Sequence, residues 1–336
     1  MKIAKNSFYN IAGYLIPGVL SIPILGFMAR DLGVEKFGLF TIILAIVGYA
    51  SIFDIGITRS VIREIAIYKR NKDEILKILS TSAVIVVALG IIAGFLITIF
   101  NTKISEFLNV SKFVTKDFLD SLAIVAFSIP LYLLTQVWCS LLEGREEFLK
   151  LNIYKTFSST MVVVFPALAL LIESSLSYAV MGLLVARFLS LLLIKLYCRD
   201  FSSNFKFHNY VFKRLIPFGV WVAGSNFICP IMSYFDRFIL ANKMGASMVG
   251  FYTAPSEAIS RISMLPSAVA RTIFPMLSSG EDDSGKIKIT SYILVLLFVI
   301  PVGCFCAYFS YDIMRLWLGN EYALKSLSFK YFLISY

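Results

Sequence analysis

The chain has 336 residues, of which 58% are hydrophobic and 15% are charged, and its mean hydropathy is +0.81. These values exclude an ordinary soluble globular domain. The net charge of +10 fits basic loops that are attracted to anionic lipid headgroups, so no nucleic-acid partner is expected. The composition therefore predicts an all-α integral membrane protein.

Long uncharged runs define the expected membrane spans, because a hydrocarbon core about 30 Å thick requires roughly 20 apolar residues per helix. Runs without Asp, Glu, Lys or Arg occupy residues 7–29, 78–102, 121–142, 215–235 and 289–311. Weaker runs with one to three charges occupy residues 37–58, 153–173, 175–196 and 248–274. We expect these nine spans and the beginning of a tenth near residue 326. The second half of the protein is therefore expected to be truncated.

The first residues, "MKIAKN", lead directly into the first apolar run without a cleavage signature, which predicts a retained first span. Placing the N-terminus in the cytoplasm puts most Lys and Arg residues into cytoplasmic loops, as the positive-inside rule requires. The five cysteines are odd in number and lie mostly in or beside spans, which argues against a disulfide framework. We expect no metal site, because "CFC" has the wrong spacing for zinc and His208 is the single histidine.

A short segment occurs twice. "ARDLGVEKFGLFT" at residues 29–41 matches "ANKMGASMVGFYT" at residues 241–253. In this alignment Gly33 corresponds to Gly245 and Gly38 to Gly250. Each copy joins two spans by a short loop, and six spans separate the copies. An even number of spans gives both copies the same orientation, as in parallel repeats related by an axis along the membrane normal.

The repeat predicts two six-helix lobes related by a pseudo-two-fold axis. We place the N-terminal lobe at residues 1–197, a basic cytoplasmic linker at 198–214, and an incomplete C-terminal lobe at 215–336. All ten prolines lie in or at the ends of spans. Proline is common in membrane helices, but bends in the spans at 7–29, 215–241 and 248–274 would also suit helices lining a cavity that alternates in shape.

Charges at bilayer depth are costly and invite a functional explanation. In the second lobe, Arg237, Arg261 and Arg271 are candidates for binding an anion, because a guanidinium binds phosphate oxygens bidentately and keeps its charge when desolvated. Asp236 and Glu257 are candidates for carrying a coupling proton or sodium ion. The alternatives are that Glu257 pairs with Arg261 one turn away, and that Asp236 and Arg237 lie at the solvated interface.

The first lobe holds few buried charges. Arg187 lies within the sixth span, and Asp54 and Arg59 lie at the inner end of the second. We include Arg187 and Arg59 among the cavity candidates and Asp54 among the ion-coupling candidates, although Asp54 and Arg59 are as well explained as helix anchors. The basic stretch at residues 59–77 is expected to form an interfacial helix on anionic lipid, or to guide an anionic substrate inward.

The start "KNSFYNIAGY", the segment from Ala29 to "ITRSVIREIA", and "DRFILANKMGASMVGFYTAPSEAI" with "ARTIFPMLS" resemble the Wzx-type O-antigen flippases. These belong to the multidrug/oligosaccharidyl-lipid/polysaccharide exporter superfamily. The resemblance covers nearly the whole chain, and the two hairpins and residues 236–278 are its most specific parts. The chain differs in length from the twelve-helix members of the family.

The resemblance implies a multi-pass protein of the bacterial inner membrane that moves undecaprenyl-pyrophosphate-linked repeat units of O antigen or capsular polysaccharide to the periplasmic leaflet by alternating access. It implies no catalysis and no cofactor. A proton or sodium gradient is expected to drive transport. A glycan polymerase and the chain-length machinery are expected partners. A drug/cation antiporter of the same superfamily and a membrane glycan polymerase or ligase are the alternatives. The "EDDSG" segment at 281–285 is better explained as a solvated loop than as a metal-nucleotide site.

Overall fold

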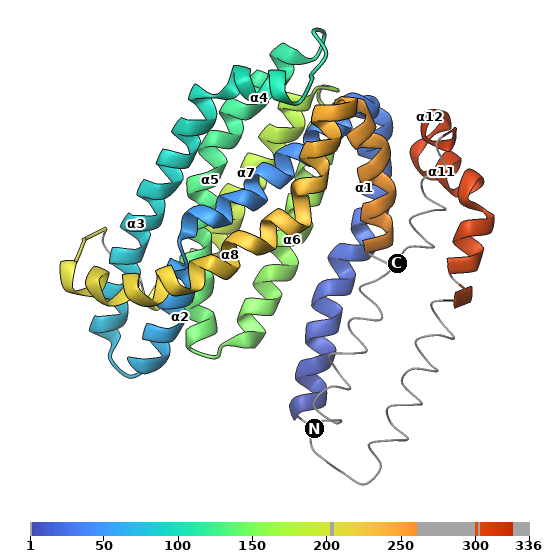
Figure 1. Ribbon diagram of the computed structural model, residues 1–336. Coiled ribbons are helices and arrows are strands. Elements are labelled where there is room, and N and C mark those ends of the chain that lie inside the picture. Colours follow the sequence, from blue (N-terminus) through green and yellow to red (C-terminus); the bar gives the residue numbers. More distant parts are fainter. Residues whose placement is uncertain (1, 202–204, 261–299, 302, 325–336) are drawn as a thin grey trace. The chain divides into compact units, whose positions relative to one another are not determined.

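The computed structural model describes residues 2–201, 205–260, 300–301 and 303–324, with side chains from residue 17 onward except 225–227 and 229–230. The described residues form helices and no strands, which confirms the all-α class (Figure 1). The long helices are α1 (Lys2–Tyr49), α3 (Lys72–Ile99), α5 (Thr115–Gly144), α6 (Phe148–Leu170), α7 (Leu176–Tyr197) and α8 (Asn209–Met244). The short ones are η1 (Ala50–Asp54), α2 (Ile57–Ile67), α4 (Asn101–Phe107), η2 (Arg199–Phe201), α11 (Ser310–Leu318) and α12 (Asn320–Ala323).

Among the described residues, five helical segments are long and apolar enough to cross a membrane: Pro17–Asp54, Lys72–Ile99, Thr115–Gly144, Phe148–Leu170 and Leu176–Tyr197. The last four match the expected spans at 78–102, 121–142, 153–173 and 175–196. Pro17–Asp54 overlaps both expected spans at 7–29 and 37–58, and the expected span at 215–235, within α8, is not among the five. Helix α3 begins six residues before its apolar run because the Asn71 side chain accepts a hydrogen bond from the Glu74 amide at 3.1 Å and caps the first turn. The expected spans at 248–274 and 289–311 lie partly outside the described residues.

The first expected hairpin is tighter than predicted. Two helices meet in a kink at Gly33, whose φ of 72° and ψ of 171° are not helical, so the connection within α1 is this residue rather than a loop over 30–36. Gly245 directly after α8 has φ 87° and ψ 164°, and residues 246–260 are again helical. These backbone angles suit glycine and strain other residues. The sequence repeat is therefore also a repeat of backbone conformation.

A third break of the same kind follows α11. Gly319 has φ 102° and ψ 177°, and α12 begins at the next residue. It lies 210 positions after Asn109, which also has a positive φ of 48° and follows α4 directly after Leu108. Leu108 and Leu318 are both buried. The spacing of 210 differs from the 212 of the sequence repeat, so Asn109 and Gly319 are not aligned positions of that repeat.

The chain divides into two compact units, residues 35–250 (unit 2) and residues 1–34 with 251–336 (unit 1). Unit 2 is built around α5, which packs against α3, α7 and α2, while α6 packs against α7. Close approach is possible at Gly90, where an added carbon would lie 2.7 Å from Pro130, and at Gly182, where it would lie 2.8 Å from Pro166. Small residues at such helix crossings are typical of membrane proteins.

Helix α8 is attached to unit 2 at both of its ends (Figure 1). At the end near α2, called the α2 end, the Ser60 hydroxyl donates to the Leu215 carbonyl at 2.9 Å. At the opposite end, called the Gly245 end, the Asn242 side chain donates to the Phe107 carbonyl at 2.8 Å, and the Asn109 side chain donates to the Asn242 carbonyl at 2.6 Å. Helix α8 is therefore held along the length of unit 2.

The described part of unit 1 has its own contacts. The Trp317 indole donates to the Ile22 carbonyl at 2.6 Å, and Arg30 donates to the Arg315 carbonyl at 3.4 Å. The Phe251 and Tyr322 rings lie 5.3 Å apart. The two hydrogen bonds join the first part of α1 to α11, and the ring contact joins residue 251 to α12.

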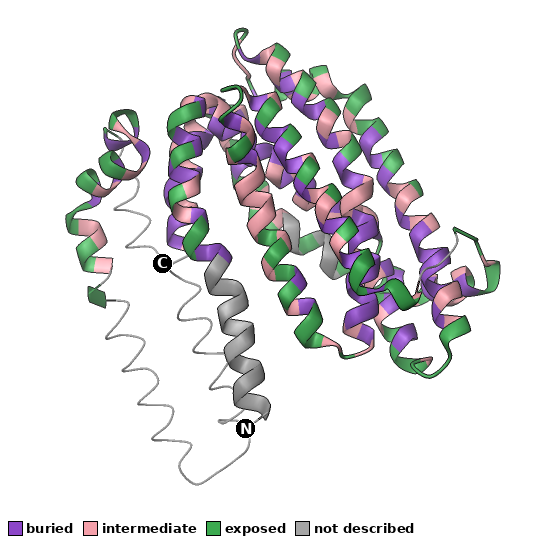
Figure 2. Cartoon of the chain, turned by 180° about the vertical axis from the view of Figure 1, so that it is seen from behind, coloured by how far each residue is buried: buried purple, intermediate pink, exposed green. Residues whose placement is uncertain are grey.

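Exposed apolar side chains are spread along the helices of unit 2 (Figure 2). They include Ile91 and Phe95 on α3, Phe127 on α5, Phe157 on α6 and Leu192 on α7. Such surfaces suit contact with lipid rather than water. The expected lobe boundary at 198–214 stays a prediction, since α8 begins at Asn209 but belongs to unit 2 by its contacts.

Candidate functional site

Asp54 and Arg59 lie at the α2 end of unit 2. Asp54 is 4% exposed and accepts hydrogen bonds from the Thr58 amide at 3.1 Å and from the Thr58 hydroxyl at 2.6 Å. Arg59 forms an ion pair with Glu143 at 3.5 Å, and its side chain is largely exposed. In this geometry both residues anchor the first turn of α2, which was one of the two explanations considered for them.

Arg187 lies on α7 within the interior of unit 2. Its guanidinium lies over the Tyr132 ring of α5, with 4.7 Å between the guanidinium carbon and the ring centre. Its Nε atom is buried and has no hydrogen-bond partner among the described residues. One turn later on α7, Ser190 accepts a hydrogen bond from Ser158 of α6 at 2.9 Å. Arg187 thus packs against α5, and its Nε donor has no acceptor among the described residues.

Arg237 lies on α8 and is 9% exposed. One of its terminal nitrogens lies 3.5 Å from the Thr41 carbonyl of α1, and its guanidinium lies 5.5 Å from the centre of the Tyr234 ring. We call Arg187, Tyr132, Tyr234 and Arg237 the arginine–tyrosine cluster, because each of its two arginines lies over a tyrosine ring.

The structure separates the remaining candidates. Asp236 is exposed, and its carboxylate accepts from the Arg237 amide at 2.9 Å. Glu257 belongs to unit 1 and is partly exposed. Arg261 and Arg271 lie outside the described residues, so the expected pairing of Glu257 with Arg261 stays a prediction.

The tyrosines of the cluster were not predicted from the sequence. Tyr132 lies in the middle of the apolar helix α5, whereas tyrosine in membrane proteins is usually concentrated at the interfaces. Its place within an apolar run was therefore a signal that could have found it. Tyr234 lies near the end of the expected span at 215–235 and carried no such signal. Aromatic rings next to arginine lower the cost of holding a cation away from water.

An apolar cavity of about 480 Å³ lies in unit 2 beside Tyr49. The Tyr49 ring contacts Tyr234 at 5.9 Å and Phe238 at 5.5 Å. The other residues lining the cavity come from the end of α1, η1, α3, α4, α5 and α8: Ile46, Ala50, Ile52, Phe53, Ile97, Phe107, Ile129, Ile231 and Phe235. The cavity therefore has almost entirely hydrocarbon and aromatic walls.

A network of ion pairs at the α2 end was not predicted either. Arg214 of α8 forms ion pairs with Glu64 of α2 at 2.5 Å and with Glu74 of α3 at 3.4 Å. Its guanidinium lies over the Tyr68 ring at 4.4 Å, and the Tyr210 hydroxyl donates to Glu74 at 2.9 Å. Glu64 is only 2% exposed. We call these residues the α2-end network.

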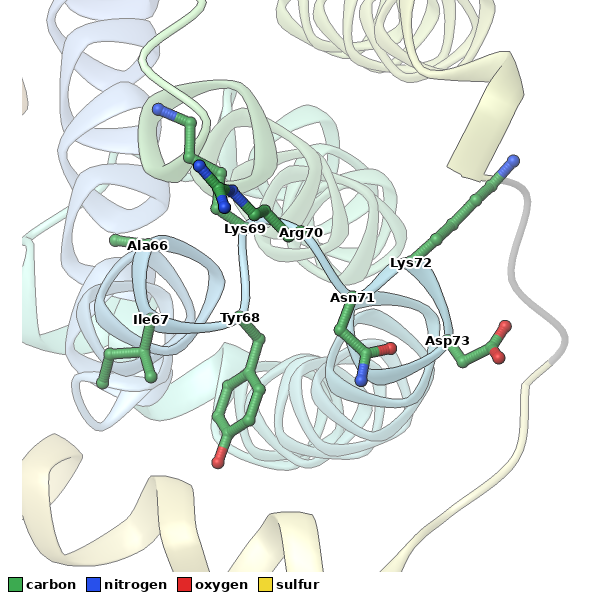
Figure 3. A pocket seen from close by; sticks show the side chains of 8 residues that line it. All are labelled: Ala66, Ile67, Tyr68, Lys69, Arg70, Asn71, Lys72 and Asp73. Carbon is green, nitrogen blue, oxygen red and sulfur yellow. The ribbon is translucent and has the colours of Figure 1, made fainter.

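The basic stretch at 59–77 is not one helix. Helix α2 ends at Ile67 and α3 begins at Lys72, and the apolar face of α2 is buried in unit 2, where Ile57, Val61 and Ile65 are fully covered. The turn from Ala66 to Asp73 lines a surface hollow of about 600 Å³, and Figure 3 shows the Lys69 and Arg70 side chains extending away from Tyr68. The predicted interfacial helix is thus replaced by an exposed basic turn.

The described residues contain no group of three His, Cys, Asp or Glu side chains that could hold a metal ion. The candidate site instead combines buried arginines, tyrosines and an apolar cavity inside a bundle of long apolar helices. Together with the long apolar helices, these features define a multi-pass membrane protein. They suit an amphipathic anion better than a soluble metabolite.

Sequence comparison identifies the family. Residues 3–281 match the family described as "Polysaccharide biosynthesis protein". The chain is 42% identical over 332 residues to the "Putative O-antigen transporter" of Shigella flexneri, with 98% of this chain and 79% of that protein covered. It is 24% identical over 303 residues to "Lipopolysaccharide biosynthesis protein WzxC" of Escherichia coli (strain K12), with 87% and 58% covered. The chain belongs to this polysaccharide biosynthesis family, as a Wzx-type member of the superfamily that the resemblance indicated.

Solved structures support the fold. An inward-facing multidrug resistance MATE family transporter of the MOP superfamily superposes with a TM-score of 0.68 at 14% identity, covering 96% of this chain and 79% of that chain. The MATE multidrug transporter DinF-BH, solved with a bound ligand, gives a TM-score of 0.64 at 12% identity, covering 96% and 76%. At these identities the likeness concerns the fold alone.

Proposed function

We propose that this protein is a flippase that moves undecaprenyl-pyrophosphate-linked oligosaccharide repeat units, of O antigen or capsular polysaccharide, from the cytoplasmic to the periplasmic leaflet. The names of the two relatives support a role in O-antigen or lipopolysaccharide export. The observation that carries the proposal is Arg187, which is held inside apolar helices with a buried donor that has no partner among the described residues.

A buried arginine in this setting is suited to phosphate. Its charge persists after desolvation, and its planar donors match two phosphate oxygens at once. A cation would be repelled by Arg187 and Arg237, so the arginine–tyrosine cluster favours the lipid-pyrophosphate substrate over a cationic drug. The tyrosine rings stabilise both guanidinium groups while the site is empty and supply hydroxyl groups to sugar or phosphate when it is filled.

We place the protein in the bacterial inner membrane with a cytoplasmic N-terminus, so that the basic turn at residues 66–73 faces anionic headgroups of the cytoplasmic leaflet. Transport by alternating access would expose the cluster to each side in turn, and a proton or sodium gradient acting through Asp236 or Glu257 would drive it. A glycan polymerase and the chain-length machinery would receive the exported units. No step in this scheme requires catalysis by the protein.

The test uses cells that lack the gene and carry a plasmid-borne copy. Radiolabelled lipid-linked repeat units are followed in both leaflets. Wild-type protein should clear the cytoplasmic leaflet, whereas Arg187→Gln should slow clearance about tenfold or more, because a hydrogen bond to a charged group contributes about 1.5–3 kcal/mol. Arg187→Lys should retain part of the rate. The matched control is Arg199→Gln, which removes an exposed arginine just after α7.

Two results would contradict the proposal. If repeat units cross at the same rate without the gene, the protein is not their flippase. If export is intact but the drug tolerance or the glycan chain length of the cells changes, then the antiporter or the polymerase alternative applies. Equal clearance by Arg187→Gln and wild type at matched protein levels would remove Arg187 from the mechanism.

A further inference from the structure

We propose that the apolar cavity beside Tyr49 holds part of the polyprenyl chain of the lipid-linked substrate, with the attached phosphate at Arg237. This inference rests on the proposed function and adds a location for the lipid part of the substrate, which the flippase assignment by itself does not give.

The walls of the cavity suit a branched hydrocarbon chain. They consist of isoleucines, an alanine and aromatic rings from α1, η1, α3, α4, α5 and α8, and the volume is about 480 Å³. Phe107 and Phe235 at the lining are each 53% exposed, so the cavity reaches the surface of unit 2. An opening of this kind would let the remainder of a long chain stay in the bilayer. Pockets of this size and apolar character are typical ligand sites.

A polar end adjoins the apolar walls. Tyr49 lines the cavity, its ring contacts Tyr234, and Tyr234 lies under the Arg237 guanidinium. The chain of contacts therefore runs from hydrocarbon walls through two tyrosines to a buried cation. Such an arrangement complements a molecule with an apolar chain attached directly to an anionic group.

The position of Arg237 favours a lipid in transit over a resident phospholipid. Arg237 is buried within the protein, with 9% of its surface exposed. A phospholipid in its usual place keeps its phosphate in the headgroup layer outside the hydrocarbon core. A carried lipid, in contrast, must bring its phosphate past the interior.

The experiment is photolabelling of the purified full chain in phosphatidylcholine nanodiscs. The probe is undecaprenyl phosphate carrying a diazirine in its chain, and the labelled peptides are identified by mass spectrometry. We expect label at residues 46–53 of α1 and η1 and at residues 231–238 of α8. Excess unlabelled undecaprenyl phosphate should remove this label, whereas dioleoyl phosphatidic acid should not.

Matched variants test the cavity itself. Ile97→Trp and Ile231→Trp fill it from two different helices, and both should reduce the label about tenfold, the effect of losing about 1.4 kcal/mol of binding. Ile91→Trp and Ile228→Trp add the same bulk at exposed positions of the same helices and should leave the label unchanged. Arg237→Gln should weaken competition by undecaprenyl phosphate but not by undecaprenol.

Three outcomes would overturn the inference: equal label in cavity and control variants, equal competition by phosphatidic acid, or no effect of Arg237→Gln on phosphate-dependent competition. The probe carries no sugar and the assay involves no transport, so the result is separable from the flippase test. Specific label with unchanged glycan export in deleted cells would leave the cavity assignment standing and the proposed function wrong. If the flippase test gives the expected result but no specific label is found, the proposed function stands and the cavity assignment is wrong.

Discussion

A carbon atom added at Gly38 would lie 2.7 Å from the backbone nitrogen of Gly250, so these two glycines bring two helices into backbone contact. They are the matching positions of the sequence repeat, 212 residues apart. Equivalent residues of two related segments meet only where the segments cross near their shared axis. The contact therefore locates the crossing point of the two copies within unit 2.

The first prediction concerns this crossing. Gly38→Val should destabilise the protein by about 1–3 kcal/mol, because the new side chain overlaps the backbone of residues 246–250 and cannot be relieved by a rotamer change. Thermal unfolding in detergent would measure the loss. Gly224→Ala is the control, since nothing lies within 4 Å of the added carbon on α8. It should be neutral or stabilising by up to about 1 kcal/mol. Equal melting temperatures for both variants would contradict the crossing.

The second prediction concerns the α2-end network. Arg214→Ala leaves Glu64 buried beside Arg63 alone, which pairs with it at 3.3 Å but is half exposed. Loss of a partner from a buried pair costs up to about 3–5 kcal/mol. The double variant Arg214→Met with Glu64→Leu should recover much of this loss, because it removes both charges. If the double variant is less stable than Arg214→Ala, the unpaired charge of Glu64 is not the cause of the stability loss in Arg214→Ala.

The third prediction separates two roles for Asp54. As an anchor of the first turn of α2, Asp54→Ala should lose about 0.5–2 kcal/mol of stability, whereas Asp54→Asn should lose little because its amide oxygen still accepts from Thr58. Unfolding and glycan export would be measured together. If Asp54→Asn keeps full stability but abolishes export, its charge has the ion-coupling role instead.

The fourth prediction concerns Cys198, which follows α7 and is 4% exposed. Burial raises the pKa of its thiol from 9.0 to about 12. Its alkylation should therefore stay slow as pH is raised to about 9, where a cysteine introduced as Arg199→Cys in a Cys198→Ala background should react quickly. Fast labelling of Cys198 in the folded protein would contradict its burial.

The raised pKa of the Cys198 thiol also makes the stability of the protein depend on pH. The folded pKa is raised, so the contribution of Cys198 is complete below pH 9.0, where both states hold the proton. Above pH 9.0 the unfolded thiol ionises first, and this contribution is lost as pH rises toward about 12. Cys198→Ala should therefore show a weaker decline in melting temperature over this range.

The fifth prediction concerns the basic turn. Lys69, Arg70 and Lys72 are exposed, and each basic group near an anionic surface contributes about 1 kcal/mol of binding. Changing all three to Gln should weaken the preference of the reconstituted protein for phosphatidylglycerol over phosphatidylcholine, and high salt should remove the difference. The control changes Lys103, Lys112 and Lys116, which lie near the opposite end of unit 2, to Gln. An equal loss in both triple variants would contradict a specific role for the turn.

The sequence determined the class of the protein and much of its plan. Apolar runs predicted the bounds of α3, α5, α6 and α7 to within six residues, since hydrocarbon thickness sets the length of a helix. The glycine spacing predicted a repeat, and the backbone angles of Gly33 and Gly245 show it. Arg187 and Arg237 could be selected because a charge in an apolar run is rare and costly.

Tertiary structure alone decided which of these residues act together. Tyr132, Tyr234 and the two arginines come from three helices far apart in sequence, and the ion pair of Arg214 with Glu64 joins residues 150 positions apart. Periodicity along one helix reports which face is apolar, but it carries no information about which neighbour covers that face. The joining of helices at Gly33 without a loop, the cavity beside Tyr49 and the Gly38–Gly250 crossing all depend on those neighbours.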